Sequence, residues 1–171
     1  GFHGTSHQYV SQQVAKLENR PIEDMKIISC HLGQGGSICA IQNGKSVETS
    51  MGLTPLAGIP MGTRSGDIDP SIITFLMKKE NLSADEIERI LNKESGILAL
   101  SGVSQDCRDI EAAAAEGNER AILAIKAHNY LVASQIVKCA VAMNGFDTMI
   151  FTAGIGENQV NIRKGICENL R

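Results

Sequence analysis

Short apolar runs separated by glycine-rich turns occupy the stretch from residue 26 to residue 50. Residues 26–32 (KIISCHL) predict a buried strand, residues 37–42 a second strand and residues 45–50 a third. Asn43-Gly44, between the second and third runs, is a strong signal for a tight hairpin. The pattern therefore predicts an antiparallel meander of three strands, with the glycine-rich turn 33–36 between the first two.

Apolar residues at helical spacing appear before and after this region. A first helix is expected to run to Leu17, with Thr5 or Ser6 as its cap. Asp69-Pro70 combines a capping carboxylate with a proline suited to the first helical position, and predicts a packed helix over 70–79. Ser83, followed three residues later by a glutamate, forms a capping box that opens another helix.

The second half of the chain predicts further helices. Residues 95–108 are expected to form a loop, and residues 110–116 an alanine-rich helix. Apolar positions repeat at helical spacing over 119–144 at residues 122, 125, 132, 136, 140 and 143, which predicts a long core helix. Gly145 is expected to supply its C-cap.

A strand, a glycine turn and a helix are expected to close the sequence. Residues 147–152 predict a buried strand, residues 153–158 the turn, and the apolar positions Val160, Ile162 and Ile166 the helix. This arrangement typically places a ligand at the carboxyl end of a strand and at the start of a helix.

Composition narrows the class of protein. A chain of 171 residues, 43% of them hydrophobic, predicts one domain with a core. The net charge of −3 gives no reason to expect nucleic acid or an anionic membrane as a partner. The five cysteines are scattered, which is typical of reduced thiols in a cytoplasmic protein. Charged residues interrupt the most apolar segment, residues 121–143, which argues against a membrane span. The absence of an initial methionine and the helical pattern at Arg171 suggest that both ends are cut.

Residues 62–70 (GTRSGDIDP) concentrate polar and glycine residues around one arginine, Arg64. A guanidinium on a tight loop can bind phosphate or carboxylate oxygens through two parallel hydrogen bonds. Alternatively, Arg64 pairs with Asp67 or Asp69 and only holds the loop together. Composition alone does not choose between the two.

His3 and His7 lie four residues apart in the opening motif, so a helix would place them on one face. Three interpretations are open: two ligands of a zinc site, hydrogen-bonding residues in the first turn of a helix, or a His3 that faces a substrate.

Glycines cluster at residues 33–36, 62–66 and 154–156. Such turns let backbone N–H groups approach an anion without side chains in the way. Neither the Walker spacing nor a Rossmann fingerprint is present. If the three turns converge, they would bind one phosphate-bearing ligand, so nucleotide binding is the leading hypothesis.

The same residues resemble the acetate kinase family, within the superfamily of acetate and sugar kinases, Hsp70 and actin. The resemblance implies an α/β fold: an actin-like ATPase (ribonuclease H-like) domain in which the meander and further strands are packed by helices. The matching motifs are Gly1 to His7, His31 to Gly35, Met61 to Pro70 and Phe151 to Asn158. The family usually has Asn and Ala where this chain has Gln34 and Gly36, and an aromatic residue at Cys107.

What the resemblance implies is transfer of a phosphoryl group from ATP to acetate with Mg²⁺. His3 and Arg64 would be catalytic, and Asp67 and Asp69 loop supports. Nucleotide-binding residues would come from three segments: His31, Leu32, Gly33, Gln34 and Gly35; Asp106, Cys107 and Arg108; Gly154, Ile155, Gly156, Glu157 and Asn158. No residue matches the family's metal-binding glutamate, so the metal ligands are unknown.

The resemblance also implies that residues 1–171 are a single nucleotide-binding domain, truncated at both ends relative to a two-domain family that forms homodimers in the cytoplasm. Three alternatives stay open: a propionate or butyrate kinase with the same motifs, a non-catalytic module of the Hsp70 or actin type, and a fragment that binds nucleotide but is catalytically silent.

Overall fold

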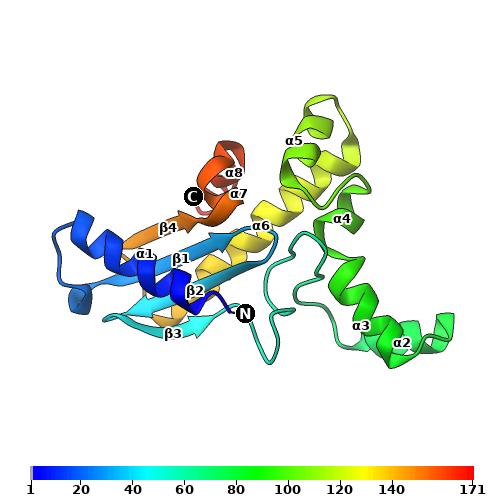
Figure 1. The fold of residues 1–171 in the computed structure, drawn as a ribbon, viewed down its shortest axis with the longest axis horizontal. Coiled ribbons are helices and arrows are strands. Elements are labelled where there is room, and N and C mark those ends of the chain that lie inside the picture. The colour runs from blue at the N-terminus through cyan, green and yellow to red at the C-terminus, as the bar shows by residue number, and fades with distance from the viewer. Residues whose placement is uncertain (1) are drawn as a thin grey trace.

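The computed structural model describes residues 2–171, so Gly1 of the opening motif lies outside the described residues. The elements follow one another along the chain as shown in Figure 1. They are α1 (Gly4–Leu17), η1 (Ile22–Asp24), β1 (Lys26–Leu32), β2 (Gly36–Gln42), β3 (Lys45–Thr49), α2 (Ser71–Glu80), α3 (Ala84–Lys93), α4 (Gly96–Ser101), α5 (Cys107–Ala115), α6 (Glu119–Ala142), β4 (Thr148–Thr152), α7 (Ala153–Asn158) and α8 (Val160–Glu168).

The strands form a mixed sheet in the order β3-β2-β1-β4. The predicted meander is confirmed, because β1 pairs antiparallel with β2, and β2 antiparallel with β3. Asn43 and Gly44 make the predicted tight turn, with φ angles of 54° and 74°. β4 pairs in parallel with β1 at the edge of this sheet. The prediction that β4 is a buried strand is wrong: all five of its residues are half-buried, as expected for an edge strand.

Helices cover both faces of the sheet, with α1 on one side and α6 with α8 on the other (Figure 1). Successive residues of β1 point to opposite faces. Ile28 and Cys30 join the core against α6 and α8, whereas Ile27 packs towards α1. Burial on both faces explains why the neighbouring residues Ile27 and Ile28 are both apolar. Its polar residues, Ser29 and His31, lie at alternate positions on the α1 side, which matters for the site below.

The long helix α6 is the core helix that the sequence predicts, with Val132 and Ile136 buried along it and Met143 buried directly after its last residue. Its C-terminal cap differs by one residue from the prediction. Asn144 takes the left-handed conformation, with φ of 53°, and the Gly145 N–H donates to the Ala140 carbonyl at 2.9 Å. Within residues 2–171, no helix combines the length and the apolar character that crossing a bilayer requires.

The start of one helix and the existence of two short helices differ from the prediction. α1 begins at Gly4 with His3 as its N-cap, so neither Thr5 nor Ser6 caps it. The predicted loop 95–108 contains α4 and the start of α5, and the predicted glycine turn 153–158 is the six-residue helix α7. Short helices depend on tertiary contacts more than on propensity, which is why the sequence pattern did not reveal them.

The end of the chain also differs from the prediction. α8 ends at Glu168, and Asn169 and Leu170 form a turn. The sequence pattern had suggested that the helix continues to Arg171.

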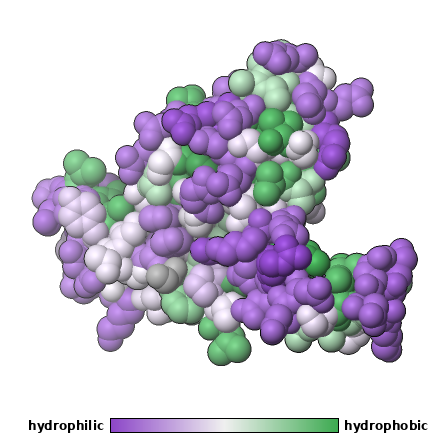
Figure 2. Space-filling view, turned by 45° about the vertical axis from the view of Figure 1, so that its right-hand side comes forward, coloured by the Kyte–Doolittle hydropathy of each residue, from purple (hydrophilic) through white to green (hydrophobic). Residues whose placement is uncertain are grey.

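Helices α2 and α3 form an arm at the lower right of Figure 1. The capping box predicted at Ser83 opens α3. The prediction that α2 is a packed helix is wrong, because none of its residues is buried and Phe75 is 58% exposed. Figure 2 shows hydrophobic colour on the corresponding arm, on a face that is otherwise mostly hydrophilic.

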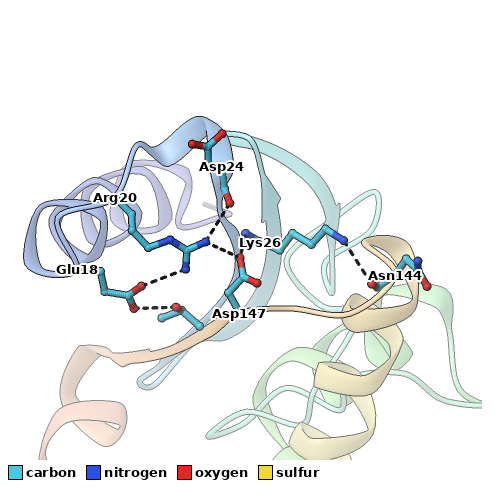
Figure 3. Close-up of polar contacts among 7 residues, drawn as sticks. Glu18, Arg20, Asp24, Lys26, Asn144 and Asp147 are labelled. Atoms are coloured by element: carbon cyan, nitrogen blue, oxygen red, sulfur yellow. Dashed lines mark hydrogen bonds and ion pairs between the residues drawn. The ribbon is translucent and has the colours of Figure 1, made fainter.

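At the far end of the sheet, Asp147 connects the start of β4 to the start of β1 (Figure 3). Its carboxylate accepts from the Lys26 N–H at 2.9 Å, and its own N–H donates to the Lys26 carbonyl at 2.8 Å. Arg20 adds an exposed ion pair at 3.4 Å. These contacts fix the register of β4 against β1, in which the last paired residues are His31 and Thr152.

Candidate functional site

The loop that carries Arg64 is held by the junction of α3 and α4. The Ser65 N–H donates to the Leu91 carbonyl at 2.9 Å, and the Ser95 N–H donates to the Thr63 carbonyl at 2.9 Å. The Thr63 hydroxyl donates to the Asn92 carbonyl at 2.8 Å. The contacts that hold the loop therefore come from α3 and the start of α4, and not from α2, the helix that follows it in sequence.

Gly96 makes this close approach possible. Its φ angle is +62°, and a Cβ atom there would overlap the Met61 carbonyl and lie 2.7 Å from the Arg64 carbonyl. Only glycine is compatible with both the backbone conformation and the contact.

The Arg64 guanidinium is not paired with either carboxylate of its loop. Its Nη1 donates to the Pro55 carbonyl at 3.3 Å and approaches the Met61 sulfur at 3.5 Å. The Asp67 carboxylate instead accepts from the Gly58 N–H at 2.8 Å, and the Asp69 carboxylate accepts from the Ser71 N–H at 2.9 Å. The two aspartates support the backbone. Among the described residues Arg64 forms no ion pair, so the pairing with Asp67 or Asp69 that the alternative interpretation required is absent.

Three histidines meet where α1 begins and β1 ends. The rings of His3 and His31 stack with centroids 3.8 Å apart and planes 13° apart. His7 is buried and its two ring nitrogens contact the Ser29 and Ser37 hydroxyls at 2.8 Å and 2.7 Å. His7 is therefore a hydrogen-bonding residue of the core. Over residues 2–171 no three metal-ligating side chains form a cluster that could hold an ion, so the zinc interpretation receives no support.

His3 and Arg64 converge on the glycine turn after β1. A Cβ atom at Gly35 would lie 3.4 Å from Arg64 Nη1 and 3.6 Å from His3 Nε2. Burial, with smaller contributions from His31 and Arg64, lowers the pKa of His3 to about 4. Burial also lowers the pKa of His31. This corner thus combines one fixed cation with neutral imidazole rings.

A pocket of about 400 Å³ opens on the other side of the same turn. That volume lies in the usual range for small-molecule sites. Its walls come from three segments far apart in the sequence, at the ends of β1 and β4 and the start of α5. The lining residues are Gly33, Gln34, Gln105, Asp106, Cys107, Arg108, Gly154, Ile155, Asn158 and Gln159. Eight were expected from the sequence; Gln105 and Gln159 were missed, although each directly adjoins a predicted segment.

Five of the predicted nucleotide-binding residues do not line this pocket. His31 and Gly35 lie at the corner with His3 and Arg64. The Leu32 side chain is buried in the core, and Gly156 is buried against Phe151, which its Cβ would approach at 3.3 Å. Glu157 turns back on its own backbone and accepts from the Ala153 N–H at 3.2 Å. The start of α7 is thus already occupied by Glu157, contrary to the expectation of a helix start left for a ligand.

Asp106 and Arg108 form a local pair at the mouth of the pocket. The Asp106 carboxylate caps α5 by accepting from the Arg108 N–H at 2.9 Å, and it pairs with the Arg108 guanidinium at 2.6 Å. Hydrogen bonding to Arg108 lowers the pKa of Asp106 to about 2. The pair keeps the Arg108 guanidinium close to the start of α5, although the arginine side chain is 79% exposed.

A mixed sheet between helices, with a polar pocket where β1 and β4 end, defines the class of protein: an α/β fold of the actin-like ATPase superfamily. Within that class the chain belongs to the acetokinase family, whose model matches residues 1–171.

Individual relatives and solved structures agree with this family assignment. The chain is 58% identical over 170 residues to the acetate kinase of Natranaerobius thermophilus, covering 99% of this chain and 43% of that protein. The crystal structure of Porphyromonas gingivalis acetate kinase superposes with a TM-score of 0.97 at 47% identity, over 99% of this chain and 43% of that one. A propionate kinase from Francisella tularensis gives 0.94 at 46% identity, over 99% and 44%. The chain thus spans less than half the length of the relatives it matches.

Proposed function

We propose that the protein containing this chain is an acetate kinase, which transfers the γ-phosphoryl group of ATP to acetate and releases acetyl phosphate and ADP, reversibly. One observation carries the proposal. Arg64 and His3 meet at Gly35, and the same turn forms a wall of the 400 Å³ pocket. A nucleotide in the pocket would therefore direct its terminal phosphate towards a cation and a neutral imidazole.

The adenine nucleotide is assigned to the pocket. Gly154, Ile155 and Asn158 would contact the adenosine together with Asp106, Cys107 and Arg108, and the backbone of Gly33, Gln34 and Gly35 would follow the phosphates. Gly156 and Glu157 do not face the pocket and would support the 154–158 segment through their contacts with Phe151 and Ala153. Leu32 would support the 33–36 turn in the same way, from the core. His31 contributes through its stack on His3.

Phosphoryl transfer depends on alignment and charge stabilisation more than on covalent chemistry by the protein. Arg64 would bind the equatorial oxygens of the transferring group and the carboxylate of acetate, because its planar guanidinium can donate to two oxygens at once. Neutral His3 would donate one hydrogen bond to a transferring oxygen. Both groups are held before substrate arrives, Arg64 by Pro55 and Met61, and His3 by Ser37. Such preorganisation is a main source of rate acceleration.

Mg²⁺ is part of the proposal because it neutralises the phosphates of ATP in kinases. Residues 2–171 do not form a cluster of three carboxylate, histidine or cysteine ligands. No residue of this chain is therefore assigned to the metal, and no step is derived through it.

Acetate would be enclosed by parts of the protein outside this chain, with residues 1–171 acting as a single nucleotide-binding domain. The protein is further proposed to be a cytoplasmic homodimer with small-molecule substrates and no nucleic acid or membrane partner.

The test is an assay of the full-length protein with MgATP and acetate, propionate or butyrate, following the acyl phosphate and ADP. We expect acetate to give the highest kcat/KM. A protein that forms ADP but no acyl phosphate, or that prefers a longer acid, would overturn the assignment to acetate.

A further inference from the structure

The buried contacts behind His3 form a chain of four side chains that ends in the core. His3 Nδ1 lies 2.9 Å from the Ser37 hydroxyl, Ser37 lies 2.7 Å from His7 Nε2, and His7 Nδ1 lies 2.8 Å from the Ser29 hydroxyl. The Ser29 and Ser37 side chains are fully buried and His7 is 5% exposed. Bulk water therefore does not supply alternative partners along this chain of contacts.

Two orders of protons run in one direction along these contacts, since a neutral imidazole has one N–H and a hydroxyl can donate or accept. A third arrangement, in which Ser37 accepts from both rings, would leave the buried Ser37 O–H without an acceptor and is disfavoured for that reason. In the first order, Ser29 donates to His7 Nδ1, His7 Nε2–H donates to Ser37, and Ser37 donates to His3 Nδ1. His3 then carries its proton on Nε2. In the second order every bond is reversed, and His3 Nε2 is an unprotonated acceptor.

The last residue of the chain of contacts separates the two orders. The Ser29 hydroxyl has no hydrogen-bond partner other than His7 among the described residues. In the second order Ser29 only accepts, so its own O–H is left buried without an acceptor. In the first order every O–H and N–H of Ser29, His7 and Ser37 has an acceptor. Unpaired buried donors are rarer in proteins than unfilled acceptor lone pairs, so the first order is favoured.

We propose that Ser29, His7 and Ser37 hold His3 in its neutral Nε2–H tautomer, so that it presents a hydrogen-bond donor at the Arg64 corner. His3 Nε2 is the ring nitrogen that faces Gly35 and Arg64. Ser37 and His7 are thus positioning residues, which act through His3 without touching substrate. This deepens the proposed function and rests on it only for the consequence in catalysis; the tautomer is a property of the protein alone.

The lowered pKa values of His3 and His7, both about 4, agree with neutral rings near neutral pH. The stack on His31 acts in the same direction, since a second positive charge 3.8 Å away would be repelled. His3 is therefore suited to donate a hydrogen bond rather than to act as a general base, because its Nε2 carries no free lone pair.

The experiment uses the full-length protein labelled with nitrogen-15 in histidine only, without nucleotide. Two-bond proton–nitrogen spectra near neutral pH distinguish the Nε2–H tautomer, the Nδ1–H tautomer and the imidazolium. The His3 signals are assigned by their loss in His3→Asn. We expect wild-type His3 as the Nε2–H tautomer; either other form would overturn the proposal, whether or not the protein has kinase activity.

Ser37→Ala tests the positioning role. It removes the donor to His3 Nδ1, so we expect a mixture of tautomers and a kcat lower by about 10-fold, as for one lost hydrogen bond, with KM for ATP changed less than kcat. The matched control is Ser6→Ala, which removes a hydroxyl 2.8 Å from His31 Nδ1 but outside the chain of contacts. It should leave the His3 tautomer unchanged.

A folded Ser37→Ala protein in which His3 remains purely the Nε2–H tautomer would overturn the role of Ser37. If that variant does not fold, the wild-type spectrum still decides the tautomer. Absence of acyl phosphate formation by a wild-type protein that shows the Nε2–H tautomer would contradict the proposed function and leave this inference intact.

Discussion

His3 and His31 lie face to face, with ring centroids 3.8 Å apart and planes 13° apart, although they are 28 positions apart in sequence. The end of β1 and the turn that follows it, which carry His31 and Gly35, therefore lie against the start of α1. Two imidazoles at this distance are stable together only if at most one is charged.

The first prediction follows from those rings. His3 and His7 have pKa values lowered from 6.5 to about 4, mainly by burial. The unfolded chain therefore binds more protons than the folded one between these values. The stability that the neutral rings contribute is fully present above about pH 6.5 and is lost as the pH falls towards about 4. Thermal unfolding should show a falling Tm over this range.

The control is His7→Gln, which removes one of the two groups and should reduce the dependence of Tm on pH. Part of the dependence should remain, because burial also lowers the pKa of His31 and His128. An unchanged slope in a folded His7→Gln protein would mean that His7 is already protonated or that its pKa is not lowered.

Arg64→Ala should reduce kcat far more than it changes the affinity for nucleotide. Arginines that stabilise a transferring phosphoryl group contribute roughly 10³–10⁵ in rate. The matched control is Arg120→Ala, since Arg120 also donates to backbone carbonyls, those of Ala99 and Leu100, but away from the corner. Steady-state kinetics of both variants decide the point: near-normal turnover of Arg64→Ala would remove Arg64 from the reaction.

His3→Ala should also act mainly on kcat, with a loss of about 10²-fold, as expected for one preorganised donor. His3→Asn keeps a donor of shorter reach and should lose less than His3→Ala. Equal effects on KM for ATP and on kcat would instead indicate that His3 only shapes the nucleotide pocket.

Gly154 offers a direct test of the pocket. A Cβ atom there meets nothing within 4 Å, so a larger residue is tolerated by the fold and projects into the open space. We expect the affinity for ADP to fall from Gly154→Ala to Gly154→Val, measured by calorimetry. Gly156→Val is a poor alternative, because its side chain would press on the Phe151 backbone, and it should lower Tm instead. A folded Gly154→Val protein with unchanged ADP affinity would contradict the adenosine assignment.

Residues 1–171 alone are expected to bind nucleotide without turnover. Acceptor, donor and metal must be held together, and a misplacement of about 1 Å can cost about 10²-fold. The chain covers 43% of the Natranaerobius thermophilus relative, and in the proposed function its pocket and Arg64 corner would supply only the nucleotide side of the reaction. A coupled assay for acetyl phosphate with the purified chain, beside the full-length protein, tests this; sustained product formation by the chain alone would refute it.

The sequence predicted the meander and the long core helix because both depend on local signals, such as Asn43-Gly44 and the helical spacing in α6. It also indicated most of the pocket, through glycine and polar residues at the ends of elements. The support of the Arg64 loop by α3 and α4 could not be predicted, since it consists mainly of backbone hydrogen bonds between segments distant in sequence. Ser29 and Ser37 carried no signal either, because a serine in a buried strand reveals its role only when its partner is known.

The parallel pairing of β1 with β4 has a consequence for how the protein can vary. The walls of the pocket are placed by main-chain hydrogen bonds and by the register that Asp147 fixes at the opposite end. Side chains at Gln34 and Cys107 only line walls that are already in place. Substitutions of these lining side chains would therefore change which ligand the pocket prefers without moving its walls. Substitutions at the Asp147 end, far from the pocket, would instead shift the strands that carry those walls.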